Sequence, residues 1–265
     1  MTRITQAFTR LKKAGQSAFI PYLTAGYPNT RTCLDLIRTL EDQGADIIEI
    51  GIPFSDPLAD GPTIQKASTQ ALAAGMTAQK AMDLAAQVRK RSGIPIVMMT
   101  YYNIVARRGL AHFMRQARAA GVDGLICADL PPEEAGDLIP AARAARIDTI
   151  FLAAPTSSAD RLRRINRVCR GFLYYVSITG TTGARADLPA DLTGQLDRVR
   201  HQSRLPVCVG FGVSKQEQVR RLRRHADGII VGSAVVKSVE GKKGAAAVNA
   251  LKRFVRPLIK AAHGE

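Results

Sequence analysis

Short runs of apolar, β-branched residues recur along the chain, and segments with apolar positions at helical spacing separate them. Near-continuous apolar character is typical of parallel strands covered on both faces, and a spacing of three to four residues indicates helices with one buried face. The predicted strands span residues 18–24, 46–52, 95–101, 124–130, 148–154, 171–178, 206–212 and 228–234. The helices predicted between them include 30–43, 77–92, 108–120, 133–145, 157–168 and 214–224.

This alternation, repeated eight times, predicts an α/β protein built as a closed (β/α)8 TIM barrel. The 265 residues fit the length of about 250 that one barrel needs, so residues 1–265 are expected to form a single domain. An open doubly wound sheet is the alternative, but it usually carries G-x-G-x-x-G after its first strand, where this chain has T-A-G-Y-P-N-T. The segment before the first strand is patterned as an amphipathic helix and predicts an extra N-terminal helix.

Two connections are longer than the roughly two to six residues usual between a strand and a helix. One follows strand 2, from Pro53 to about Ala74, and has room for a short extra helix. The other follows strand 6, from Thr179 onward. Both leave carboxyl ends of strands, where barrel enzymes build their active sites. We interpret the second, which is rich in glycine and threonine, as a lid over a substrate.

Composition and charge alter this picture little. Apolar residues make up 46% of the chain, and no run approaches the roughly 18 apolar residues of a membrane helix. No secretory signal is recognisable, so a cytoplasmic location and no membrane partner are expected. The net charge of +16 favours anionic substrates. Its arginines are spread over predicted helices without interleaved aromatic residues, so we interpret them as solvated faces and expect no nucleic-acid partner.

The four cysteines, Cys33, Cys127, Cys169 and Cys208, are widely separated. They form no C-x-x-C pair and no cluster with histidine, so the sequence predicts structural thiols and no metal site.

Glu49 lies within predicted strand 2, on the same face as Ile47 and Gly51. If Ile48 and Ile50 meet the surrounding helices, Glu49 enters the barrel near its top. A buried, unpaired carboxylate is costly and responds with a raised pKa, which suits proton transfer near neutral pH. The alternative is a structural ion pair, but the eight predicted strands contain no lysine or arginine. We therefore predict a catalytic role for Glu49.

Asp56 and Asp60 follow in P-F-S-D-P-L-A-D-G-P. Aspartate beside proline or glycine commonly caps backbone amides in turns, and that interpretation competes with catalysis for each. Their place just beyond the strand that carries Glu49 favours a functional role for one of them. The residue pattern alone does not distinguish which.

Three glycine-bearing loops predict a phosphate site. Strand 7 runs into Gly210–Gly212, strand 8 into Val231–Ala234, and Thr181–Gly183 follows strand 6. Barrels often hold phosphate on backbone amides of the loops after strands 7 and 8 and on the first turn of a short helix. Ser233 adds a hydroxyl to this set.

With these residues placed, the sequence closely resembles the tryptophan synthase alpha subunit family over essentially its whole length. The matching motifs are P-Y-L-T-A-G-Y-P, E-I-G-I-P-F-S-D-P-L-A-D-G-P-T-I-Q, M-T-Y-Y-N, A-D-L-P, Y-Y-V-S-I-T-G-T-T-G, V-G-F-G-V-S and V-G-S-A-V-V-K. Other phosphate-binding barrels share the glycine elements but lack the second motif, which makes the resemblance specific.

The resemblance implies retro-aldol cleavage of indole-3-glycerol phosphate to indole and glyceraldehyde 3-phosphate, within tryptophan biosynthesis. It maps the catalytic acid/base to Glu49 and the second carboxylate to Asp60. Protonation at C3 turns the indole ring into an electron sink, and an ionised aspartate stabilises the positive character at the ring nitrogen. Removal of the proton from the side-chain hydroxyl starts the collapse.

The resemblance also implies the remaining binding residues. The predicted phosphate ligands are Gly183, Gly212, Gly232 and Ser233. Tyr174 and Thr182 match positions that contact the substrate or support Asp60, and Tyr22 and Tyr101 match the apolar wall around the indole. The chain departs from the family at two positions, with Tyr22 where phenylalanine is frequent and Thr181 where valine is common.

A pyridoxal-phosphate-dependent beta subunit is the implied partner, in an α2β2 heterotetramer. Pro53 and Asp56 are predicted to lie at that interface, and this chain is expected to bind no cofactor or metal. The alternatives are a stand-alone lyase of the same family that releases free indole, another sugar-phosphate barrel enzyme, and a nucleic-acid-binding module. A Schiff-base aldolase needs a lysine inside the barrel, and the predicted strands contain none.

Overall fold

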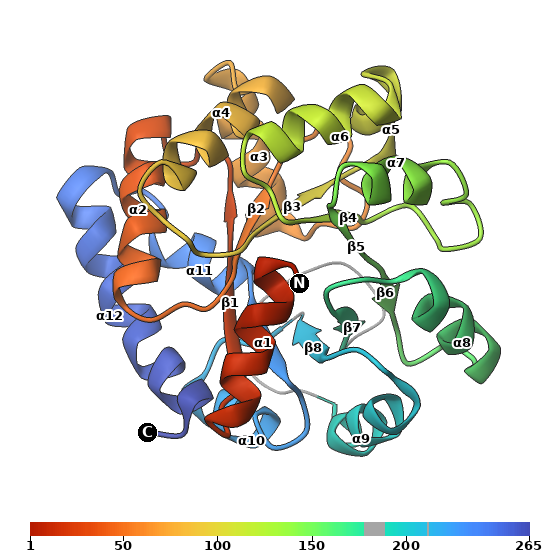
Figure 1. Cartoon of the computed structure of the whole chain (residues 1–265). Helices are drawn as coiled ribbons and strands as arrows, with labels where there is room; N and C mark the ends of the chain where they lie inside the picture. The colour runs from red at the N-terminus through yellow and green to blue at the C-terminus, as the bar shows by residue number, and fades with distance from the viewer. Residues whose placement is uncertain (178–188, 211) are drawn as a thin grey trace.

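The strands form a parallel barrel that helices surround (Figure 1). The computed structural model describes residues 1–177, 189–210 and 212–265. Within them the strands are β1 Ala18–Thr24, β2 Ile48–Gly51, β3 Ile96–Thr100, β4 Gly124–Cys127, β5 Asp148–Ile150, β6 Leu152–Ala153, β7 Leu173–Val176, β8 Val207–Gly210 and β9 Gly228–Val231. Their spatial order is β5-β4-β3-β2-β1-β9-β8-β7-β6. All eight predicted strands are present, which confirms the barrel.

The fifth predicted strand, 148–154, closes the barrel as two short pieces. β5 pairs with β4, and β6 pairs with β7. The strand changes partners at Phe151, whose carbonyl accepts a hydrogen bond of 3.1 Å from the Tyr174 amide. The sequence pattern reports burial, which is continuous here, and it carries no signal for a change of partner.

Helices cover the outside of the barrel and both of its ends. They are α1 Arg3–Lys13, α2 Thr30–Asp42, α3 Pro62–Ala73, α4 Ala78–Arg89, α5 Tyr102–Arg107, α6 Leu110–Ala119, α7 Leu138–Ala144, α8 Ala159–Val168, α9 Leu192–Gln202, α10 Gln216–Leu222, α11 Ser233–Ser238 and α12 Gly244–His263. Each predicted helix has a counterpart, whereas α5, α9, α11 and α12 were not among those predicted. None of these helices combines the length and apolar character needed to cross a bilayer.

The connection after strand 2 contains the extra helix for which its length had room. Residues 52–61 have no regular structure, and α3 then begins at Pro62, a residue whose fixed φ suits the first turn of a helix. The predicted long connection after strand 6 falls mostly within 178–188, outside the described residues.

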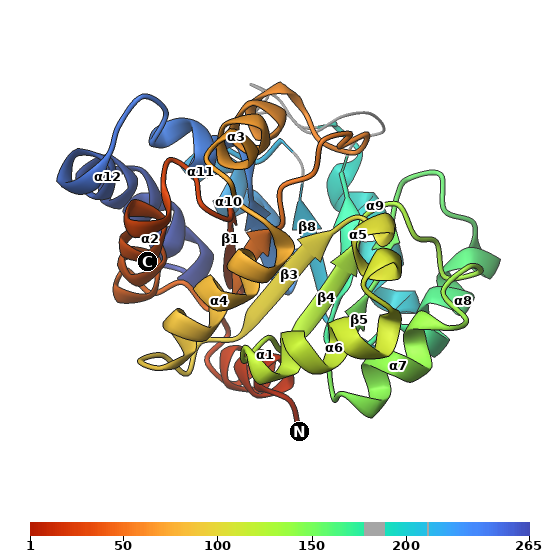
Figure 2. The ribbon, with the colours of Figure 1, turned by 90° about the horizontal axis from the view of Figure 1, so that it is seen from above.

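The predicted N-terminal helix, α1, lies across the amino-terminal end of the barrel, opposite to α3 (Figure 2). Its buried face consists of Ile4, Ala7, Phe8 and Leu11. The Phe8 ring packs on that of Phe172, with 5.9 Å between centroids. The Ile4 side chain fills the space left by glycine at the start of β4, because a Cβ on Gly124 would come within 2.9 Å of it. This packing closes one end of the barrel.

All four cysteines are buried and unbridged. This placement agrees with their interpretation as small apolar core residues.

Candidate active site

Glu49 points into the barrel from β2, as the alternation of the strand predicts. It lies opposite Tyr22 of β1 and Val97 of β3 in the strand registers, and its side chain is 1% exposed. Its Oε2 atom is buried without a hydrogen-bond partner among the described residues. A carboxyl oxygen in that state is available to a ligand that enters the barrel.

Asp60 reaches the same interior from the loop after β2, where Tyr101, the residue after β3, orients it. The Tyr101 hydroxyl donates to Asp60 Oδ2 at 3.2 Å and accepts from the Ala59 amide at 3.1 Å. The Phe54 ring stacks on that of Tyr101, 5.1 Å between centroids. Asp60 is 5% exposed, and within the described part of the chain its Oδ1 has no hydrogen-bond partner.

Burial changes the acidity of both carboxyl groups. Desolvation, with a smaller contribution from the charge of Asp60, raises the pKa of Glu49 to about 8. Desolvation raises the pKa of Asp60 to about 6, although the hydrogen bond from Tyr101 opposes the increase. Near neutral pH the pair therefore holds one proton on Glu49 and one negative charge on Asp60, an arrangement suited to acid–base chemistry beside a developing positive charge.

The two carboxyl groups line one narrow cavity at the carboxyl end of the strands. Its remaining lining residues are Tyr22, Ile64, Met99, Tyr174, Gly212, Val213, Ile230, Gly232, Ser233 and Ala234. The cavity is therefore apolar on its sides, acidic on the side of β2 and glycine-rich where β8 and β9 end. An apolar pocket with a few convergent polar groups is the usual form of a small-molecule site.

Two glycines allow tyrosine rings to lie against the barrel wall. A Cβ on Gly51 would collide with the Tyr22 hydroxyl, and one on Gly210 would collide with that of Tyr174. Because these positions carry no side chain, both rings lie flat over the strand ends and remain at most 5% exposed. The Tyr22 hydroxyl also contacts the Thr24 hydroxyl at 3.3 Å.

The predicted phosphate residues that are described line this cavity where β8 and β9 end. Gly212 has φ +85°, a left-handed conformation that favours glycine. Gly232 precedes α11, and Ser233 is its first residue. Backbone amides at the start of a helix favour an anion, so this end of the cavity fits a phosphate group.

The other predicted residues are distributed as follows. Tyr22 and Tyr174 line the cavity, and Tyr101 contacts Asp60. Thr182 and Gly183 lie outside the described residues. Asp56 is exposed and accepts a hydrogen bond from the Ser55 hydroxyl at 2.6 Å. Pro53 is buried within the chain itself.

Four apolar lining residues were not singled out from the sequence: Ile64, Met99, Val213 and Ile230. The alternation that identified Glu49 could have found Met99, because Met99 and Tyr101 share a face of the predicted strand 95–101. Ile64 lies on α3, and no strand periodicity applies to it.

Comparison with known proteins agrees with this geometry. The family described as tryptophan synthase alpha chain matches residues 8–263. The tryptophan synthase alpha chain of Geobacter sulfurreducens is 45% identical over 262 residues, covering 96% of this chain and 99% of the relative. That of Roseiflexus castenholzii is 48% identical over 259 residues, covering 97% and 99%.

Solved structures give the same result. Tryptophan synthase subunit alpha from Legionella pneumophila superposes with a TM-score of 0.92 at 36% identity, over 99% of this chain and 98% of that one. A chain of Mycobacterium tuberculosis tryptophan synthase gives 0.92 at 35% identity, covering 100% and 99%.

Proposed function

The chain belongs to the tryptophan synthase alpha chain family, and we propose that its Glu49 and Asp60 together carry out the cleavage of indole-3-glycerol phosphate. It is a lyase of the alpha reaction in tryptophan biosynthesis, which yields indole and glyceraldehyde 3-phosphate. The observation that carries the residue assignment is the pair of buried carboxyl groups in one cavity, each with an oxygen that has no partner among the described residues.

Glu49 serves as proton donor and then as proton acceptor. With its pKa raised to about 8, it carries a proton at neutral pH and gives it to C3 of the indole ring. The resulting carboxylate takes the proton from the hydroxyl on the carbon attached to C3. The hydroxyl becomes a carbonyl as the bond between C3 and that carbon breaks. The two electrons of the broken bond return to the ring and restore its aromaticity. Glu49 ends protonated, so one carboxyl group balances the reaction.

Asp60 remains ionised and stabilises the positive charge that appears on the ring nitrogen after C3 is protonated. Its hydrogen bond from Tyr101 keeps Oδ2 fixed, which leaves Oδ1 for the N–H of the indole. A preorganised charge in a site shielded from water stabilises a transition state strongly, because it need not reorganise during the reaction.

Two kinds of lining residue suit the two ends of the substrate. Tyr22 and Tyr174 provide flat apolar surfaces for the indole. Gly212, Gly232 and Ser233 hold the phosphate, and Thr182 and Gly183 are proposed to complete the site from the segment after β7. Because the substrate is held at both its indole and its phosphate, the reacting carbon stays beside Glu49.

The free-enzyme pKa values predict a bell-shaped pH dependence of kcat/KM with its maximum between about pH 6 and pH 8. Below about 6, Asp60 becomes protonated and loses the charge that stabilises the ring nitrogen. Above about 8, Glu49 loses the proton that it must donate. The measurement is initial-rate indole formation from pH 5 to 9.5.

The basic limb is the more specific result, because the substrate phosphate itself titrates with a pKa of about 6 and contributes to the acid limb. A rate that keeps rising to pH 9.5 would mean that Glu49 acts from its ionised form. The order of the two proton transfers would then be reversed.

We further propose that the loop after β2 contacts a pyridoxal-phosphate-dependent beta subunit in an α2β2 assembly in the cytoplasm, and that the cofactor belongs to that subunit. Leu58 is 87% exposed, in the same loop as the exposed Asp56 and only two residues before Asp60. An exposed leucine beside an active-site entrance is typical of a surface that a partner covers. Pro53, buried beneath it, would hold the loop in shape.

Leu58→Asp should weaken association with the beta subunit by at least about tenfold, because a desolvated carboxylate opposes burial. Association is measured by calorimetry, with Leu58→Met as the matched control that retains the apolar surface. Indole formation by the chain alone should not change in either variant. Equal affinity for the Asp and Met variants would place the interface elsewhere, and no association in any variant would favour a stand-alone lyase.

A further inference from the structure

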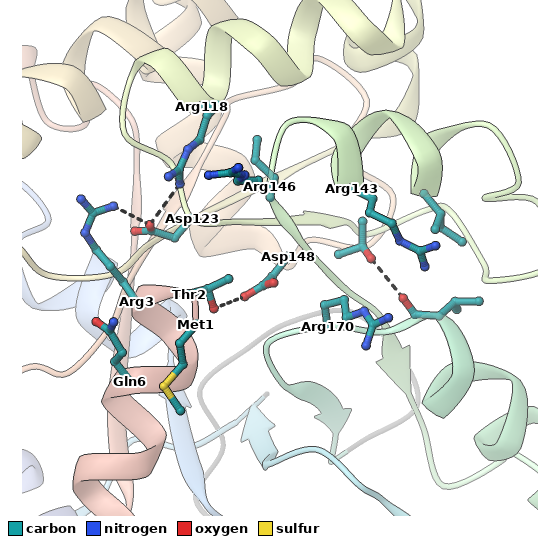
Figure 3. A pocket seen from close by; sticks show the side chains of 14 residues that line it. Met1, Thr2, Arg3, Gln6, Arg118, Asp123, Arg143, Arg146, Asp148 and Arg170 are labelled. Carbon is teal, nitrogen blue, oxygen red and sulfur yellow. Dashed lines mark hydrogen bonds and ion pairs between the residues drawn. The ribbon is translucent and has the colours of Figure 1, made fainter.

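A second cavity lies at the end of the barrel opposite to Glu49, beside the amino terminus of α1 (Figure 3). Its volume is about 700 Å³. Among its lining residues, Asp123 and Arg170 precede β4 and β7, and Asp148 is the first residue of β5. The cavity therefore lies at the amino-terminal strand ends. We call it the arginine pocket, defined by Arg3, Arg118, Arg143, Arg146 and Arg170 with Asp123 and Asp148.

The arginine pocket has an excess of positive charge, since five guanidinium groups face two carboxylates. Asp123 is already saturated: Arg3 contacts it at 2.9 Å and Arg89, from outside the pocket, at 2.8 Å. Arg118 lies 3.8 Å from the same carboxylate. Asp148 accepts a hydrogen bond of 2.7 Å from the Thr2 hydroxyl. The two acids therefore leave most of the arginine charge uncompensated.

Arg143 and Arg146 carry much of that excess, while Arg170 also interacts electrostatically with Asp148. Among the described residues, none of the three side chains has a hydrogen bond or an ion pair. They come from α7, from the turn after it and from the segment before β7. The guanidinium group of Arg146 lies on the side of Arg118, whereas those of Arg143 and Arg170 lie on the other side of the pocket (Figure 3). Like charges repel at close range, and an anion bound among them relieves the repulsion.

Arg146 adds an independent observation from the backbone. Its φ is +56°, and within the described residues it is the one non-glycine residue with positive φ. It follows Ala145, the C-cap of α7, where glycine is the usual residue because a Cβ disfavours the left-handed conformation. Arg146 is thus held in an unfavourable backbone conformation, and its side chain lines the pocket.

The lining also restricts the class of anion. It contains no aromatic side chain on which a nucleic-acid base could stack. A guanidinium group is planar and can donate two parallel hydrogen bonds to the oxygens of one phosphate. We propose that the arginine pocket binds a small multivalent phosphate anion, such as inorganic triphosphate or the phosphate chain of a nucleotide. This site accounts for part of the high positive charge that the lyase reaction does not use.

The test is calorimetric titration of the full chain with inorganic triphosphate at low ionic strength. A Ser233→Asp background, checked for an unchanged melting temperature, excludes binding at the active-site phosphate position by like-charge repulsion. We expect one bound triphosphate per chain, with an affinity at least about tenfold above that for orthophosphate and falling with added salt. Nucleotide triphosphate without metal, run in parallel, should bind equally well if the phosphate chain alone is recognised.

Arg146→Gly is the sharpest variant, because it removes a charge and relieves the backbone. It should weaken triphosphate binding by about tenfold while the melting temperature stays equal or rises. Arg143→Gln and Arg170→Gln should weaken binding similarly, which keeps the test valid if one variant folds poorly. Arg253→Gln on α12, exposed and outside the pocket, is the matched control and should leave binding unchanged. None of the four arginine variants should alter indole formation in the chain that retains Ser233.

Three results overturn the proposal. The first is the absence of triphosphate binding at low salt. The second is an equal loss of affinity in Arg253→Gln and in the pocket variants, which would reduce the effect to overall charge. The third is tighter binding of a 15-residue oligothymidylate than of triphosphate, which would identify the basic face as a nucleic-acid surface.

Discussion

Glu49→Gln should reduce indole formation from indole-3-glycerol phosphate by at least about 1,000-fold. The amide has the shape of the carboxyl group but can neither give nor take the proton, so both transfers lose their catalyst. The effect should fall on kcat, because the phosphate and indole contacts remain. Indole is quantified by chromatography after incubation with a large excess of enzyme, and Glu134→Gln, an exposed glutamate on the surface, is the matched control with full activity.

Loss of activity must be separated from loss of structure. The pKa of Glu49 is about 8 in the folded chain, above its ordinary value of 4.5. The folded state therefore binds more protons between these values, and the free energy of unfolding falls as the pH rises through that interval. Glu49→Gln removes this group, so its unfolding free energy should depend less on pH while its fold is retained. A folded variant with more than a tenth of the normal rate would remove Glu49 from the proton-transfer role.

Asp60→Asn should lower kcat by about 100-fold or more and change KM by less than about threefold. Asparagine can still accept the hydrogen bond from Tyr101, so the side chain keeps its position and loses only its charge. The charge acts on the ring nitrogen after C3 is protonated, and an interaction confined to the transition state appears in kcat. Steady-state kinetics over a range of substrate concentrations separate the two parameters.

The matched control is Asp42→Asn, which removes the same charge from the exposed end of α2. It should have wild-type kinetics. A large increase in KM with unchanged kcat in Asp60→Asn would instead make Asp60 a binding residue. Unchanged values of both parameters would return it to the role of a turn residue, the interpretation that its neighbours Gly61 and Pro62 also permit.

Much of the fold follows from local pattern, because a parallel barrel buries every strand and exposes one face of every outer helix. The limits of β1 agree with its pattern at both ends. The strand at 228–234 ends earlier, at Val231, because Ser233 begins α11. Backbone hydrogen bonding, which no hydropathy pattern reports, decides such boundaries.

The site divides in the same way. Glu49 could be predicted because strand geometry alone determines its direction. Asp60 and Asp56 could not be distinguished by pattern, since the hydrogen bond that orients Asp60 comes from Tyr101, 41 residues away in sequence. The resemblance to the family favoured Asp60, and the structure shows Asp60 buried in the cavity and Asp56 exposed. Their chemical roles remain predictions.

The packing of α1 closes the barrel at its amino-terminal end, so the active-site cavity has no opening there. With Ile4 and Phe8 filling that end, substrate, water and both products must exchange through the same opening, at the carboxyl ends of the strands. Products must leave before the next substrate can enter. A protein that covers the opening would therefore determine where the released indole goes. The position of the opening, and not a separate binding site for indole, would then direct this neutral product.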